Sequence, residues 1–123
     1  MLATCAFLLT AFVAIQHIAF LVLEMFLWTK PAGMKVFGLK KDFAKATAAL
    51  AANQGLYNGF LAAGLIWSLA TSDGALASPL QQFFLGCVII AGIFGGITVK
   101  GTIVVVQAVP ALLALVLSFA GRG

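Results

Sequence analysis

Polar and ionisable side chains interrupt several otherwise apolar stretches of this 123-residue sequence. An ionisable group inside an apolar stretch is costly unless it is paired or hydrated, so such groups usually face the interior of a helix bundle. On this ground we expect a ligand-binding site formed by His17, Glu24, Asn53, Gln54, Tyr57, Asn58 and Gln107. A carboxyl group, an imidazole, a phenol and several amides can bind a polar head group or pass protons between them.

Metal binding and direct acid–base catalysis fit these residues less well. His17 and Glu24 are seven residues apart, which on a helix means ~20° around the axis and ~10 Å along it. A catalytic acid and base need to be closer, and this spacing does not make a metal-ligand pair. Cys5 and Cys87 show no paired spacing either. We therefore expect no metal and no cofactor, and binding rather than catalysis.

The elements that hold these side chains are predicted to be membrane-spanning helices. Hydrophobic residues make up 63% of the chain and charged residues only 8%, too few charges to cover a soluble domain. The net charge of +4 comes largely from lysines between Lys30 and Lys45. A juxtamembrane cluster of this kind indicates anionic lipid head groups rather than nucleic acid. We expect membrane lipids as partners and no nucleic acid.

The fold class expected is all-α, a polytopic bundle of four transmembrane helices forming one domain over residues 1–123. Pro31 and Gly33 mark the end of the first helix, Asp42 is expected to cap the second, and Pro79 to begin the third. Pro110 is expected to kink the fourth. A β-barrel is excluded because so short a chain offers no closed pattern of strands. The predicted helices cover about 2–28, 43–70, 79–99 and 102–120, with a cytoplasmic connector at 29–42.

The lysines predict the orientation of these four helices. The connector, the start of the second helix and the tight turn at Lys100 would lie on one face and carry every lysine, while Asp73 and Arg122 would lie on the other. By the positive-inside rule the lysine face is cytoplasmic, so both termini are outside. The predicted location is the bacterial cytoplasmic (inner) membrane, crossed several times.

This orientation brings the polar residues to a similar depth. Because the second helix would run antiparallel to the first, its amides would lie between the depths of Glu24 and His17, and Gln107 would enter from the same side. The site is therefore predicted in the inner half of the bilayer, with almost no polar group in the outer half. Small-residue stripes should let the helices pack closely, within one chain or alternatively in a homo-oligomer. These packing residues are Gly55, Gly59, Gly92 and Gly96.

Two longer motifs carry a resemblance to a known family. Residues 24–39 read EMFLWTKPAGMKVFGL and residues 51–64 read AANQGLYNGFLAAG. With the helix that holds His17 and Glu24, they resemble domain of unknown function 1304, a family of small bacterial four-helix membrane proteins. The likeness spans the whole chain. It implies the fold and topology but brings no activity.

The function predicted from these observations is binding of a small amphipathic or lipid-soluble molecule in the polar pocket. One alternative is a small transporter or channel that works as an oligomer, although the outer halves of the helices offer few groups to line a path. Another is an intramembrane isomerase that uses Glu24 and His17 to exchange protons. A fourth is a structural subunit that binds a partner through its glycine faces.

Overall fold

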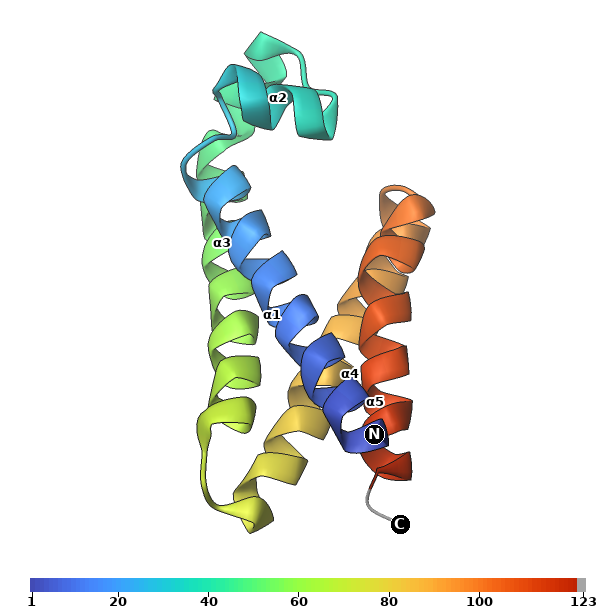
Figure 1. The fold of residues 1–123 in the computed structure, drawn as a ribbon. Coiled ribbons are helices and arrows are strands. Elements are labelled where there is room, and N and C mark those ends of the chain that lie inside the picture. Colours follow the sequence, from blue (N-terminus) through green and yellow to red (C-terminus); the bar gives the residue numbers. More distant parts are fainter. Residues whose placement is uncertain (122–123) are drawn as a thin grey trace. The chain divides into compact units, whose positions relative to one another are not determined.

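The computed structural model describes residues 1–121, and every element in that range is helical (Figure 1). The all-α prediction is confirmed, whereas Arg122 lies outside the described residues. A short helix and one π-helical turn add to the four long segments expected. The elements are α1 (Leu2–Met25), α2 (Pro31–Phe37), α3 (Lys41–Ala70), α4 (Gly74–Thr98), the π-helix η1 (Val104–Ala108) and α5 (Val109–Ala120).

The helices form two compact units. The connector unit is Ile15–Ala62, and the terminal unit combines Met1–Ala14 with Ala63–Gly123. Each of the long helices α1 and α3 is divided between the two units.

In the connector unit, the second part of α1 runs antiparallel to α3. Glycines allow the close approach, as the sequence suggested for such stripes. A Cβ on Gly55 would stand 2.7 Å from Met25 Cγ and 3.1 Å from Glu24 Cβ, and one on Gly59 would stand 2.6 Å from Leu21 Cδ1. Gly55 and Gly59 of α3 therefore lie against α1, and a side chain at either position would require neighbouring atoms of α1 to move.

The segment expected as a plain connector contains the helix α2. Pro31 occupies the first turn, where its missing N–H costs nothing. Gly38 ends the helix in the left-handed region, at φ 65° and ψ 37°, and the Leu39 N–H donates to Met34 O at 2.8 Å. Gly33 faces the backbone of Leu27 so closely that a Cβ there would clash with its carbonyl oxygen. This proline and these two glycines explain why α2 is short and packs on the turn that follows α1.

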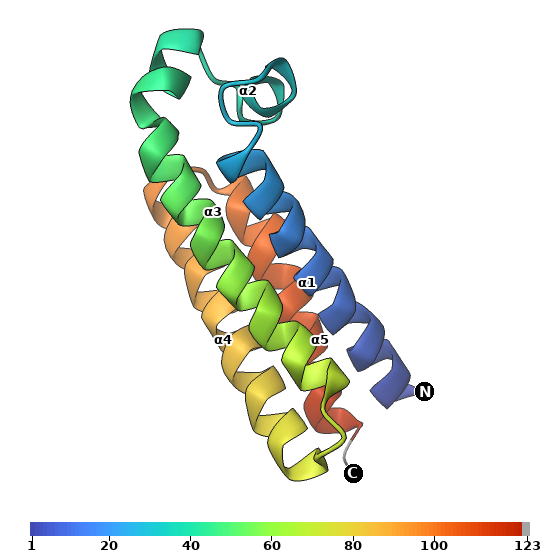
Figure 2. The same ribbon diagram turned by 90° about the vertical axis from the view of Figure 1, so that its left-hand side faces the viewer.

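In the terminal unit, α4 packs against η1 and α5, and Figure 2 shows α4 and α5 side by side. A Cβ on Gly92 would stand 2.8 Å from Ala108 N, and one on Gly96 would stand 3.3 Å from Val104 Cβ. All four glycines predicted to pack thus lie against another helix of the same chain. The question of a homo-oligomer stays open to experiment.

Helix α1 ends at Met25 rather than at about residue 28, and three further boundaries differ from those predicted, each for a local reason. Helix α4 begins at Gly74 rather than Pro79, because Asp73 caps it by accepting from the Ala75 N–H at 2.9 Å. Helix α3 begins at Lys41, so Asp42 lies within its first turn. The helix expected over 102–120 is divided into η1 and α5 just before Pro110, whose ring removes an N–H from the ladder.

Two helices, α1 and α4, are long and apolar enough to cross a membrane. The apolar stretch Val104–Ala120 is shorter. Helix α3 has 30 residues but does not meet the same criterion, because the polar residues Asn53, Gln54 and Asn58 dilute its apolar character. Four spans were expected, and two helices meet this test on length and composition.

Candidate functional site

Glu24 and Asn58 meet where α1 runs along α3 in the connector unit. The Asn58 amide Nδ2 donates to Glu24 Oε1 at 3.0 Å. Asn58 is 7% exposed and Glu24 is half-buried. The second carboxyl oxygen, Oε2, is buried and has no hydrogen-bond partner in the described part of the chain. We call this pair the Glu24–Asn58 site.

The glycines of α3 make this hydrogen bond geometrically available. Gly55 lies one turn before Asn58 on the same face, and its missing side chain leaves room for Glu24 Cβ and the Leu21 carbonyl. An asparagine side chain is short, so it reaches a carboxyl group on a neighbouring helix only when the two backbones are close. The glycine that lets the two helices approach therefore also makes the hydrogen bond between Asn58 and Glu24 possible.

His17 lies deeper in the fold than Glu24 along α1. It is 1% exposed, and its ring meets the Phe20 ring edge-on, with centroids 5.4 Å apart and planes at 75°. Two helical turns separate it from Glu24, ~10 Å along the axis. The hydrogen bond on Glu24 Oε1 comes from Asn58, an amide that does not titrate. The structure thus pairs Glu24 with a neutral donor.

The other polar residues of α3 point elsewhere. Asn53, Gln54 and Tyr57 are exposed, Tyr57 by 55%. The Tyr57 ring instead packs edge-on against Phe60, at a centroid distance of 5.7 Å. The prediction grouped these residues by depth along the helix. Successive residues are turned by 100°, so Asn53 and Tyr57 fall on the opposite side of α3 from Gly55.

Gln107 belongs to the terminal unit, where it lies in η1 beside Gly92 of α4. The structure describes it in that setting. Its predicted place at the depth of Glu24 stays a prediction.

A second side-chain bridge, which the sequence analysis did not predict, lies near the Glu24–Asn58 site. The Trp28 indole Nε1 donates to Thr47 Oγ1 at 3.0 Å, and the Thr47 hydroxyl donates to Phe43 O at 2.7 Å. The Trp28 ring also packs on Phe37 of α2, with centroids 5.0 Å apart. A tryptophan near the end of an apolar segment, as Trp28 is, is typical of a membrane–water interface. Its position inside the motif of residues 24–39 was the signal for a structural role.

The chemistry open to the Glu24–Asn58 site is that of a hydrogen-bond acceptor. One carboxyl oxygen is held by an amide, and the other is desolvated without compensation, which costs roughly 1–3 kcal/mol or more for a charged group. Such an oxygen would bind an ammonium, hydroxyl or amide donor. Within residues 1–121 no three His, Cys, Asp or Glu side chains lie close enough to hold a metal ion.

Comparison with known proteins places both motifs in one family. The uncharacterized protein YpaA of Lactococcus lactis subsp. lactis (strain IL1403) is 29% identical over 114 residues, which cover 91% of this chain and 94% of that protein. No solved structure gives a significant match. The family described as "Protein of unknown function (DUF1304)" matches residues 11–119, a range that includes Glu24, Asn58 and both motifs. The resemblance seen in the sequence is confirmed, and the chain belongs to the DUF1304 family.

Proposed function

We propose that the chain is a four-span membrane protein that binds a small amphipathic molecule at the Glu24–Asn58 site. Its head group would donate a hydrogen bond or a cationic N–H to Glu24 Oε2. The observation that carries this proposal is the buried, unpartnered Oε2 beside an oxygen already held by Asn58. A buried polar atom without a partner calls for an explanation, and a ligand is one.

The case for four spans starts from the two apolar helices and extends to their neighbours. A 24-residue helix such as α1 is ~36 Å long, enough for a hydrocarbon core of ~30 Å. The bonds Glu24–Asn58 and Trp28–Thr47 join α1 and the turn that follows it to α3 in antiparallel order. If α1 crosses the bilayer, α3 returns through the same thickness. In the terminal unit, η1 and α5 pack on α4 and would share its depth.

Exposed apolar side chains along α4 also support a lipid environment. Phe83, Ile90, Phe94 and Ile97 are 65%, 70%, 67% and 80% exposed. Between the first and last of them α4 extends ~21 Å. Soluble monomers rarely expose a continuous apolar surface of this extent, whereas lipid tails cover one at no cost.

A donor-bearing amphiphile suits the chemistry of the site better than the alternatives. The Asn58 amide fixes Oε1 but brings no proton to exchange, so the arrangement favours binding over an isomerase reaction. A ligand that reaches Glu24 from the lipid would keep its apolar tail beside α1 and bring only its head group to Oε2. A protonated primary amine is the head group with the strongest pairing to a carboxylate.

The test uses a site-specific probe. Full-length protein labelled with ¹⁵N is titrated in detergent micelles with dodecylamine, and the side-chain amide signals of Asn58 and Asn53 are followed by NMR. The proposal predicts a saturable shift of the Asn58 signal and little change at Asn53, which is exposed on the opposite side of α3. Dodecanoic acid, which cannot bring a cation to Oε2, should leave both signals in place.

Glu24→Gln supplies the matched variant, because it keeps the size of the side chain and removes the carboxylate. The dodecylamine shift at Asn58 should disappear in Glu24→Gln and persist in Asn53→Ala. Equal, unsaturated drifts of both amide signals would indicate partitioning of the amine into the micelle and would overturn the proposal. A Glu24→Gln variant that responds to dodecylamine like the unchanged protein would overturn it as well.

A further inference from the structure

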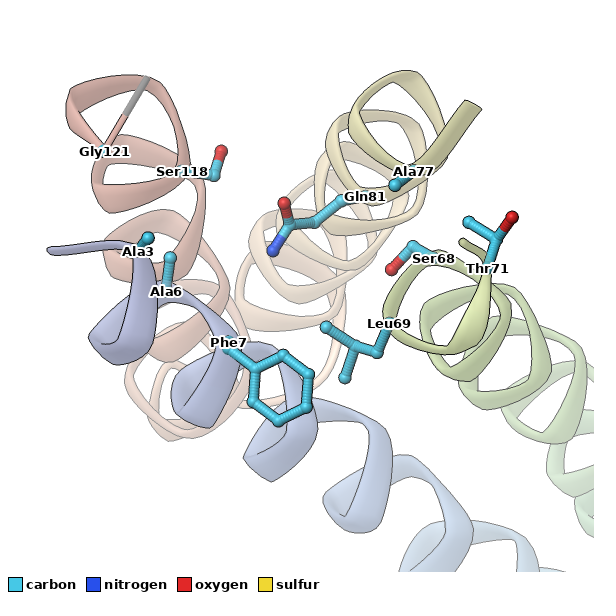
Figure 3. A pocket seen from close by; sticks show the side chains of 10 residues that line it. All are labelled: Ala3, Ala6, Phe7, Ser68, Leu69, Thr71, Ala77, Gln81, Ser118 and Gly121. Atoms are coloured by element: carbon cyan, nitrogen blue, oxygen red, sulfur yellow. The ribbon is translucent and has the colours of Figure 1, made fainter. Parts of the chain in front are cut away.

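A cleft in the terminal unit is lined by uncharged polar and apolar side chains. It lies where the start of α1, the end of α3, the start of α4 and the end of α5 come together, and its volume is about 290 Å³ (Figure 3). We call it the terminal cleft. Its polar lining includes Ser68, Thr71, Gln81 and Ser118, and Phe7 and Leu69 form part of its apolar lining. From the sequence almost no polar group was predicted in this part of the helices.

The serine hydroxyl groups of the cleft have already used their protons. Ser68 Oγ donates to Leu65 O at 2.6 Å, and Ser118 Oγ donates to Leu115 O at 2.7 Å. Each bond runs back along its own helix, so the oxygen lone pairs remain for a donor from outside. Both serines are 6% exposed. The cleft therefore presents hydrogen-bond acceptors in a largely desolvated setting.

Gln81 is fixed in place among these acceptors. Its Nε2 donates to Thr10 Oγ1 at 2.8 Å, and the Thr10 hydroxyl donates to Ala6 O at 2.8 Å. Thr10 is fully buried. Figure 3 shows the Gln81 side chain reaching from α4 toward α1, with the Ser68 hydroxyl pointing into the same space. Because Nε2 is engaged by Thr10, the orientation of the amide is set and its carbonyl oxygen adds another acceptor.

The lining also excludes charged ligands. Among the described residues that form it there is no Asp, Glu, Lys, Arg or His, and a desolvated ion without a partner of opposite charge is costly. One water occupies ~30 Å³ of liquid, so the volume suits a head group of a few polar atoms and the beginning of an alkyl chain. Phe7 and Leu69 would cover that chain.

We infer that the terminal cleft binds the head group of a neutral, hydroxyl-bearing amphiphile, whose hydroxyl proton is donated to one of the three acceptor oxygens of Ser68, Gln81 and Ser118. The cleft belongs to the terminal unit and Glu24 to the connector unit, and the two sites differ in chemistry. Glu24 would pair with a cation, whereas the terminal cleft would bind an uncharged alcohol. The two proposals can therefore succeed or fail independently.

The experiment is photolabelling of the full-length protein in detergent with a dodecanol that carries a diazirine near its hydroxyl end. Mass spectrometry of the digested protein locates the label. It should lie in the peptides that line the cleft and should be competed by excess dodecanol. Gln81→Leu should lower the labelling of these peptides about tenfold, since it removes one or two hydrogen-bonding groups and the anchor to Thr10. Gln82→Leu, the same change one position along α4, should not.

Ala77→Phe provides a second variant that does not touch the hydrogen bonds. Ala77 lines the cleft and is only partly buried, so the larger side chain should fill the space and abolish labelling while the helical circular dichroism stays unchanged. Label spread evenly over the apolar surface would overturn the inference. So would equal labelling by matched diazirine probes that end in a carboxylate or an ammonium group.

Discussion

Glu24 and Asn58 are 34 residues apart in the sequence and share one hydrogen bond. Each belongs to a different one of the two sequence motifs, the first to residues 24–39 and the second to residues 51–64. At the scale of the residue, the structure thus gives a physical reason for both motifs. The carboxyl group needs a donor, and Asn58 supplies it across a contact that Gly55 keeps close.

Asn58→Ala should destabilise the protein by about 1–3 kcal/mol, because it leaves Glu24 Oε1 buried without its donor. Asn53→Ala is the matched control, since the same amide is lost from an exposed position of the same helix; its effect should stay within about 0.5 kcal/mol. Thermal unfolding in detergent, followed by circular dichroism, measures both. Equal losses of stability would show that the hydrogen bond to Glu24 is not structural.

The sequence was sufficient to single out Glu24 and Asn58 as polar residues in apolar surroundings, but not to pair them. Depth along a helix follows from residue number, whereas the direction of a side chain also depends on which face meets the neighbour. The glycines Gly55 and Gly59 carried that information, since they mark the face of α3 that approaches α1. Placing Asn58 relative to Gly55 would have separated it from Asn53 and Tyr57.

At the scale of the element, the segment between α1 and α3 differs most from expectation. This basic stretch with a proline and glycines was predicted as a connector, and it contains the helix α2. Its signals were Pro31 at the first turn and Gly38 after the last, an arrangement typical of a short helix. The close contact of Gly33 with the Leu27 carbonyl could not be predicted, because it depends on how α2 packs.

Gly33→Ala should destabilise the connector unit by about 1–3 kcal/mol, the usual cost of overpacking, because its Cβ would meet backbone rather than a movable side chain. Gly74→Ala is the comparison, since nothing lies within 4 Å of a Cβ there and alanine restricts the unfolded chain. Denaturation in mixed micelles should show a loss for the first variant and no loss for the second. If both behave alike, α2 does not pack on the turn that follows α1 as described.

Gly59→Leu should disrupt folding or assembly more than Cys87→Ala. A leucine at position 59 would drive into Leu21, where even a Cβ would come within 2.6 Å, and would push α3 away from α1. Cys87→Ala removes only one sulfur from a partly buried position and should cost little. Melting temperatures in the same detergent, with the yield of folded protein as a second readout, compare the two. Similar values would remove the argument for a close α1–α3 contact.

At the scale of the whole molecule, the proposed topology puts the lysine-rich segment and the Asp73 turn on opposite sides of a membrane. This topology depends on α3 and on η1 with α5 crossing as well as α1 and α4. Composition alone reveals the two most apolar helices, whereas α3 carries polar residues that lower its hydropathy. Its role as a span rests on its pairing with α1.

Single cysteines test this topology in a background with Cys5 and Cys87 replaced by alanine. We expect a membrane-impermeant maleimide to label Ser72→Cys in intact cells and to label Lys40→Cys only after the cells are permeabilised. The positive-inside rule gives this direction, because Lys35, Lys41 and Lys45 remain on either side of position 40. Labelling of both positions from the same side would contradict four spans with the termini outside.

Native mass spectrometry of gently purified protein tests the central claim most directly, because it reports a bound small molecule and the oligomeric state together. We predict that the unchanged protein and Asn53→Ala retain an amine-bearing molecule of low mass, and that Glu24→Gln loses it while keeping the same oligomeric state. Retention of the same molecule at the same occupancy by Glu24→Gln would contradict a binding site at Glu24 and Asn58, as would the absence of any bound molecule from the unchanged protein.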